Sequence, residues 1–107
     1  VYEVLKEGEG EPAGPVDLVA CHYAGWLEEG GEPFDSSYPR GQPLEVRGVQ
    51  VIRGWGEALQ RMKPGAVWRI KVPADLGYGA DGRPPVIPGG ATLVFHVELV
   101  EVLERQK

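Results

Sequence analysis

The ionisable side chains of this 107-residue chain form no recognisable nucleophilic, acid–base or metal centre. The chain has no P-loop, no GxSxG and no HExxH motif, and no GxGxxG motif follows directly on a predicted strand. His22 and His96 each stand alone in an alternating segment, so neither a metal site nor a Ser–His dyad is expected. Cys21 is the only cysteine and lies in an apolar stretch, which favours a small buried residue over a nucleophile. We therefore expect chemistry that uses neither a cofactor nor a metal.

Five aromatic side chains give a stronger signal than the charged groups. Two lie at alternating strand positions, one opens a helical stripe and two lie in loops: Tyr23, Phe95, Trp55, Phe34 and Tyr78. Strand parity points Tyr23 and Phe95 inward, and for these two alone an ordinary core position is the preferred interpretation. Phe34 and Tyr78 are loop residues beside Asp35 and glycines. Large apolar rings in such places favour a concave apolar pocket with a few polar groups at its rim.

The segments that must position these rings are mostly predicted strands. Apolar and polar residues alternate with a period of two over residues 17–27, 67–72 and 93–100, and more briefly over 44–46. Val1–Lys6 is predicted to be an edge strand, and residues 34–37 a short extended piece. The inner face of the sheet is expected to carry Val19, Cys21, Tyr23, Trp68, Ile70, Val72, Leu93, Phe95 and Val97.

One helix is predicted, because Trp55, Ala58, Leu59 and Met62 stand at i, i+3, i+4 and i+7 and form a single apolar stripe. The Lys-Pro-Gly run at residues 63–65 is expected to end it after about two to three turns. One such helix covers one face of an antiparallel sheet. The predicted fold class is therefore α+β, with residues 1–107 as a single domain. In it, a twisted antiparallel half-barrel of about five strands wraps around one short amphipathic helix.

Composition excludes several classes of protein. The 16 glycines and 10 prolines leave little room for long helices, whereas 42% hydrophobic residues suffice for a core. The formal net charge of −5 argues against nucleic acid as a ligand. No apolar run approaches the ~20 residues that span a bilayer, so no membrane insertion is expected. We expect a cytoplasmic monomer, although a leader removed upstream of Val1 stays open as an alternative because the chain does not begin with Met.

Three blocks of the sequence resemble a known family. HYAGWLEEGGEPFDSS, VIRGW followed by a helix, and LGYGADGRPPVIPGGATLVFHVEL are similar to the FKBP-type peptidyl-prolyl isomerases, the immunophilins that bind tacrolimus and rapamycin. The resemblance runs from about Val16 to Leu103, with the blocks in the family's order. The family's fold, a twisted antiparallel sheet around one short helix, agrees with the fold expected from periodicity.

The resemblance implies an apolar pocket that holds a proline ring. Its floor would be Trp55, and its walls and one side would be Tyr23, Phe34, Phe95, Val51 and Ile52. Polar contacts are implied as well. The Ile52 backbone N–H and the Tyr78 hydroxyl would each bind a ligand carbonyl, and Asp35 would lie beside the twisted amide, paired with Arg40.

Three positions depart from the family pattern. Leu44 stands where the family usually has an aromatic residue, so one wall is smaller and aliphatic. The stretch from Pro43 to Val51 is about two residues shorter than usual, which predicts the loss of a bulge. The segment Val86-Ile87-Pro88 belongs to a flexible loop that overhangs the site, and the Gly89-Gly90 that follows it is expected to loosen that loop.

The implied activity is cis–trans isomerisation of X–Pro bonds in unfolded or folding polypeptides, with a preference for a bulky apolar residue before proline. Rotation about such a bond costs about 18–20 kcal/mol, because amide resonance is lost in the perpendicular state. A dry aromatic pocket lowers this barrier without nucleophile or metal, since the twisted amide is less polar than the planar one. Proline-containing polypeptides are the expected partners, and macrolides of the tacrolimus and rapamycin type the expected inhibitors.

Two functions from other classes are alternatives to isomerisation. A non-catalytic, chaperone-like domain would use the same groove to hold apolar peptides, but such a binder has no need of Asp35. A hydrolase that uses Asp35 and Glu32 is disfavoured, because two acids on one loop do not form an opposed acid and base.

Overall fold

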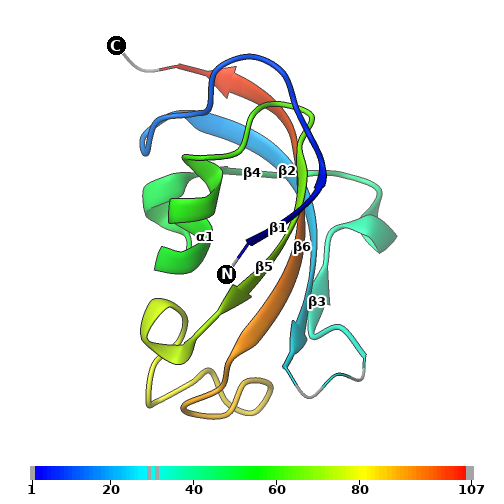
Figure 1. Cartoon of the computed structure of the whole chain (residues 1–107). Coiled ribbons are helices and arrows are strands. Elements are labelled where there is room, and N and C mark those ends of the chain that lie inside the picture. Colours follow the sequence, from blue (N-terminus) through cyan, green and yellow to red (C-terminus); the bar gives the residue numbers. More distant parts are fainter. Residues whose placement is uncertain (1, 29, 31, 106–107) are drawn as a thin grey trace.

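A curved antiparallel sheet wraps around one short helix (Figure 1). The structure is a computed structural model that describes residues 2–28, 30 and 32–105. Within these residues the strands form a six-stranded sheet in the order β1-β5-β6-β2-β3, and β4 also pairs with β2. The strand bounds are β1 Tyr2–Lys6, β2 Leu18–Leu27, β3 Asp35–Ser36, β4 Leu44–Arg47, β5 Val67–Val72 and β6 Leu93–Glu104. The predicted α+β class is confirmed.

The strand predictions hold with small changes of extent. β1 is the predicted edge strand and pairs only with β5 among the described residues, while Val1 lies outside them. The sixth strand is the two-residue β3, which the sequence predicts only as an extended piece. β4 pairs with β2 without a register shift, which agrees with the expected loss of a bulge in the shortened stretch.

Strand β2 brings the site together because it has partners on both sides. On one side its ten residues run against β6, which places Tyr23 opposite Val97 and Gly25 opposite Phe95. On the other side β4 pairs with residues 18–21 and β3 with residues 24–25. Tyr23 therefore lies where β2 passes from one partner to the next, and the segment after β3 can reach its backbone.

The inner face of the sheet and the helix form the hydrophobic core. The inner-face prediction is confirmed for the buried residues Val19, Cys21, Tyr23, Ile70, Val72, Leu93, Phe95 and Val97. Trp68 packs against the same core but is only half-buried. It lies beside the edge strand, where the Tyr2 ring covers it at 5.1 Å between ring centroids.

Helix α1 (Arg53–Leu59) lies on the concave side of the sheet (Figure 1). The residues of its predicted apolar stripe are all buried: Trp55, Ala58, Leu59 and Met62. The predicted end at residues 63–65 is wrong, because the regular helix ends at Leu59 with Gln60 as its C-terminal cap. Beyond it the Ala58 carbonyl accepts a 3-10-type bond from the Arg61 N–H at 2.9 Å and an α-type bond from the Met62 N–H at 3.0 Å.

Short 3-10 turns connect the strands and the helix. They are η1 (Tyr38–Arg40), η2 (Gly48–Gln50) and η3 (Ala74–Leu76). Turn η1 follows β3 and carries Arg40, while η2 lies between β4 and α1 and carries Gln50. None of the helices in the described part of the chain is both long enough and apolar enough to cross a membrane.

Candidate active site

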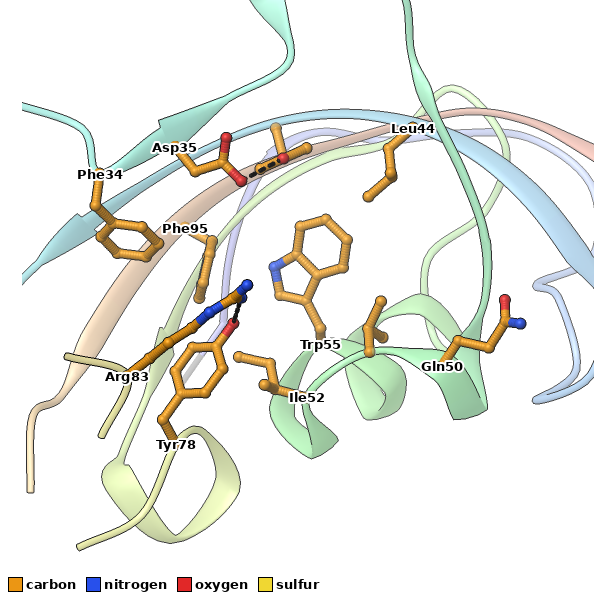
Figure 2. Close-up of a pocket in the computed structure, with 11 residues that line it drawn as sticks. Phe34, Asp35, Leu44, Gln50, Ile52, Trp55, Tyr78, Arg83 and Phe95 are labelled. Atoms are coloured by element: carbon orange, nitrogen blue, oxygen red, sulfur yellow. Dashed lines mark hydrogen bonds between the residues drawn. The ribbon is translucent and has the colours of Figure 1, made fainter. Parts of the chain in front are cut away.

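A cavity of about 320 Å³ opens between the concave face of the sheet, the start of α1 and the loop after β5 (Figure 2). Its lining residues are Tyr23, Phe34, Asp35, Leu44, Gln50, Val51, Ile52, Trp55, Tyr78, Arg83 and Phe95. The cavity brings together all the predicted site residues except Arg40, Val86 and Ile87. It adds Gln50 and Arg83, which the sequence analysis did not identify.

Trp55 occupies the centre of this cavity, as expected for its floor. It lies in the first turn of α1 and is only 4% exposed. Two rings stand against it edge-on: Tyr23 at 5.2 Å and 87°, and Phe95 at 5.6 Å and 70°. Its indole nitrogen is buried and has no hydrogen-bond acceptor among the residues that the structure describes, and it is turned toward the Phe95 and Arg83 side (Figure 2). An unpaired buried donor costs about 1–3 kcal/mol, so the packing of this ring must offset that cost.

Gly25 makes room for two walls of the cavity. The rings of Phe34 and Phe95 meet edge to face with centroids 5.7 Å apart. A Cβ on Gly25 would lie 2.6 Å from Phe95 Cε1 and 2.8 Å from Phe34 Cζ, so no larger residue fits without moving both rings. The Gly25 carbonyl also accepts a 2.8 Å bond from the Phe34 N–H. Gly25 was missed from the sequence, although a glycine inside a strand pattern is a known signal of close approach.

Tyr23, Asp35 and Arg40 form a polar group at the rim. The Tyr23 hydroxyl donates to Asp35 Oδ2 at 2.6 Å and accepts from Arg40 Nη2 at 3.2 Å. Arg40 Nη1 lies 3.5 Å from Asp35 Oδ1, which confirms the predicted pairing although Arg40 stays outside the cavity lining. Burial, followed by the hydrogen bond to Asp35, raises the pKa of Tyr23 above its usual value. The tyrosine is therefore the donor to the carboxylate throughout the neutral range.

Ser37 binds the backbone of Tyr23, a role that the sequence pattern did not indicate. It is fully buried, and its Oγ accepts a 2.8 Å bond from the Tyr23 N–H. The Ser37 N–H donates to the Tyr23 carbonyl at 2.9 Å. These bonds satisfy the backbone of Tyr23 at the point where β2 changes partners. His22 lies on the outer face, where its Nδ1 is 2.9 Å from Ser37 Oγ.

Tyr78 and Arg83 form a second polar group at the opposite rim. The Arg83 Nη1 donates to the Tyr78 hydroxyl at 3.5 Å, and its Cζ stands 5.8 Å from the centre of the Tyr78 ring. Figure 2 shows the guanidinium extending over the tyrosine toward the middle of the cavity. The sequence signal that could have indicated this contact is the presence of Arg83 in the same loop as Tyr78.

A second, adjoining cavity of about 260 Å³ is lined by the loop residues Arg83, Pro84, Val86 and Ile87, together with Phe34, Asp35 and Tyr78. Val86 is exposed, whereas Ile87 is buried in the core, and both contribute to the lining of this second cavity. Backbone bonds tie the loop together, from Arg83 N–H to the Ile87 carbonyl at 2.7 Å and from Ile87 N–H to the Arg83 carbonyl at 3.0 Å.

Gly89 has a different role from the loosening that the sequence predicts. A Cβ at this position would collide with the Ala80 carbonyl, so Gly89 permits close packing of two loop segments. Gly90 N–H also donates to the Gly79 carbonyl at 2.9 Å. The contacts therefore indicate a loop that is held down at this end.

Leu44 and Gln50 form the far end of the cavity, away from Arg83 (Figure 2). Leu44 starts β4 opposite Cys21, so an aliphatic side chain stands at this wall, as the sequence indicates. Gln50 is held by its role in η2, because its Oε1 accepts a 2.9 Å bond from the Arg47 N–H. Val51 and Ile52 complete this side and lead into α1.

The other reactive side chains are outside both cavities. Cys21 is fully buried, and burial raises the pKa of its thiol to about 12. His22 stacks on the Tyr38 ring at 5.0 Å on the outer face of the sheet. Among residues 2–28, 30 and 32–105, no cluster of three or more His, Cys, Asp or Glu could hold a metal ion.

Comparisons with known proteins place this geometry in context. The sequence profile of the family described as FKBP-type peptidyl-prolyl cis-trans isomerase matches residues 9–100. The FK506-binding protein of Neisseria meningitidis serogroup B is 47% identical over 106 residues, which cover 97% of this chain and 96% of that protein. The peptidyl-prolyl cis-trans isomerase Mip of Coxiella burnetii is 47% identical over 104 residues, but this chain spans only 45% of its length.

A solved structure agrees with these sequence matches. The crystal structure of FkpA from Escherichia coli superposes with a TM-score of 0.90 at 42% identity. The match covers 98% of this chain and 48% of that one. This chain is thus similar to the whole of one bacterial relative and to about half of two others.

Proposed function

Because this chain belongs to the family of FKBP-type peptidyl-prolyl cis-trans isomerases, we propose that it accelerates rotation about X–Pro bonds in polypeptides, with the proline ring resting on Trp55. The observation that carries this proposal is the aromatic cavity of about 320 Å³. Its floor is the buried Trp55, and its walls are rings that meet the floor or one another edge-on. A site of this size and apolar lining suits a five-membered ring flanked by two peptide groups.

The mechanism needs binding alone, since no covalent bond forms or breaks. The planar amide resists rotation by about 18–20 kcal/mol. An apolar, water-poor cavity favours the twisted amide, whose charge separation is smaller, over the planar one. The protein therefore lowers the barrier by binding the twisted state more tightly, and its residues perform no proton transfer.

Donors at two sides of the cavity orient the peptide. Tyr78 offers its hydroxyl to the carbonyl of the residue before proline. Ile52 is the N-cap residue of α1, where backbone N–H groups have no acceptor within the helix, and its N–H serves the carbonyl that follows proline. Asp35, held by Tyr23 and Arg40, faces the amide that rotates.

Polypeptides that contain proline are the proposed substrates, with no cofactor. Macrolides of the tacrolimus and rapamycin type are the proposed inhibitors, and the name of the Neisseria relative, FK506-binding protein, supports this class of ligand. The aliphatic Leu44 leaves more room at its end of the main cavity than an aromatic residue would.

A protease-coupled assay on a Leu-Pro peptide, with and without rapamycin, tests the proposal. We expect a rate that rises in proportion to protein concentration and returns to the uncatalysed rate when rapamycin is in excess. A non-catalytic peptide-binding domain would bind the same peptide at micromolar protein and leave the rate unchanged, and that result would contradict the proposal.

A further inference from the structure

We propose that Arg83 favours an acidic residue, Glu or Asp, over an uncharged residue of the same shape immediately before proline. The inference rests on the proposed function, because it names a preferred substrate class for the same site. Arg83 belongs to the lining of both the main cavity and the adjoining one. Its guanidinium reaches over Tyr78 toward the space that the substrate would occupy (Figure 2).

The position of this guanidinium is defined at both ends of the side chain. At the backbone, Arg83 exchanges two hydrogen bonds with Ile87, of 2.7 and 3.0 Å, and Ile87 is anchored in the core. At the tip, Nη1 is 3.5 Å from the Tyr78 hydroxyl and Cζ is 5.8 Å from the ring centre. A cation over an aromatic face is stabilised there by the negative charge of that face.

No ion pair among residues 2–28, 30 and 32–105 neutralises the charge of Arg83. The ion pairs among the described residues are Arg40–Asp35, Arg47–Glu104, Arg53–Glu57 and Lys71–Glu28, and none includes Arg83. Asp35, the one carboxylate in the lining of either cavity, already has Arg40 and the Tyr23 hydroxyl as partners. The ionised groups at the site are thus the Asp35–Arg40 pair, whose charges balance, and the additional cation Arg83.

The mechanism indicates which substrate residue meets this cation. Tyr78 donates to the carbonyl of the residue before proline, and Arg83 lies beside that hydroxyl. The side chain of the same residue extends into the adjoining cavity of about 260 Å³, which shares Phe34, Asp35, Tyr78 and Arg83 with the main one. A guanidinium binds a carboxylate with two parallel hydrogen bonds, a geometry that an amide or alkyl side chain does not reproduce.

The preference for an acidic residue arises from short-range contact with Arg83. The formal net charge of the chain is −5, so its long-range field does not attract acidic peptides. Arg83 is exposed, and water and salt weaken an exposed ion pair. We therefore expect a preference of about two- to five-fold in kcat/KM, which declines as salt is added.

Matched peptides that differ only in Glu-Pro, Gln-Pro or Leu-Pro test the inference. Glu and Gln have the same shape, so the ratio of kcat/KM for Glu-Pro to Gln-Pro isolates the charge. The wild type is expected to have a ratio of about two to five at low salt, Arg83→Lys to keep part of it, and Arg83→Gln to bring it to about one. Arg69→Gln is the matched control, because it removes the same charge from an exposed position on the outer face of β5.

The outcomes separate this inference from the proposed function. Turnover of Leu-Pro with an equal Glu-Pro to Gln-Pro ratio in wild type and Arg83→Gln would overturn the role of Arg83 and leave the isomerase activity standing. If no peptide is turned over, the activity is overturned, and the affinities for Glu-Pro and Gln-Pro peptides, measured by NMR titration, still decide whether Arg83 selects acidic residues. A ratio that falls equally in Arg69→Gln would attribute the effect to net charge and overturn the inference.

Discussion

The Tyr23 hydroxyl donates a 2.6 Å hydrogen bond to Asp35 Oδ2 and thereby ties β2 to β3 at the rim of the cavity. The same ring stands edge-on to Trp55 at 5.2 Å. One residue therefore positions the carboxylate and supports the floor. Arg40 closes the arrangement from outside by contacting both the hydroxyl and Asp35.

Tyr23→Phe separates these two roles, because it keeps the ring and removes the hydroxyl. We expect a stability loss of about 0.5–1.5 kcal/mol by urea unfolding, the usual net worth of one hydrogen bond. The value of kcat/KM on a Leu-Pro peptide should fall several-fold, since Asp35 Oδ2 then loses its hydrogen bond, while Arg40 and the Ser36 N–H contact only Oδ1. Unchanged activity in Tyr23→Phe would show that the position of the carboxylate is not needed.

Gly25→Ala is expected to damage the cavity through its walls. The added Cβ would lie 2.6 Å from Phe95 and 2.8 Å from Phe34, so both rings must shift. Overpacking of this kind costs about 1–3 kcal/mol, and kcat/KM should fall with it. Gly14→Ala is the matched control, because a Cβ there meets only Asp17 Oδ2 at 3.4 Å. Equal effects of the two substitutions on kcat/KM would mean that the contact of the two rings is unimportant.

Trp55→Ala should abolish rapamycin binding, measured by isothermal titration calorimetry, because the floor of the cavity is removed. The substitution also costs about 3–5 kcal/mol of stability, so circular dichroism must show that the variant is folded. Trp55→Phe supplies a milder test, with weakened binding in a folded protein. His22→Ala is the control and should retain full activity, since His22 lies on the outer face. Loss of activity in His22→Ala would contradict the assignment of the site.

The buried thiol of Cys21 predicts a loss of stability in alkali. In the unfolded chain it ionises near pH 9.0, whereas in the folded protein its pKa is about 12. The folded state therefore binds this proton more tightly, and the free energy of unfolding falls as the pH rises between these values. The slope from one such group is at most about 1.4 kcal/mol per pH unit. Below pH 9 both states are protonated and Cys21 contributes no pH dependence.

Urea unfolding at several pH values, with the wild type and Cys21→Ala compared, measures this contribution. The substitution should flatten the alkaline decline, although Tyr38, whose pKa is raised to about 12 by burial and by Glu98, leaves a remainder. Identical alkaline slopes in the two proteins would show that Cys21 is not the group responsible.

The sheet and the helix face were predictable because their signals are local. Alternation and the i, i+3, i+4, i+7 stripe depend only on which side of an element a residue occupies, and residues such as Val19, Val97 and Leu59 are buried as predicted. The helix end was not predictable from Pro64, because the regular helix ends at Leu59 and the chain continues to Met62 in mixed 3-10 and α-type hydrogen bonds.

The missed site residues act through contacts between distant parts of the chain. Gly25 matters because Phe34 and Phe95 converge on it, and Ser37 because β2 changes partners at Tyr23. Arg83 becomes part of the site only when its loop folds back over Tyr78. None of these relationships is visible in spacing along one segment, which is why pattern alone located the aromatic rings but not the residues that support them.

The most direct test of isomerisation is NMR exchange between the cis and trans resonances of a Leu-Pro peptide, which needs no coupling protease. We predict that catalytic amounts of the protein raise the exchange rate in proportion to concentration, and that Trp55→Ala or excess rapamycin abolishes the increase. An exchange rate that stays at the uncatalysed value, while peptide chemical shifts report binding at the cavity, would contradict the account.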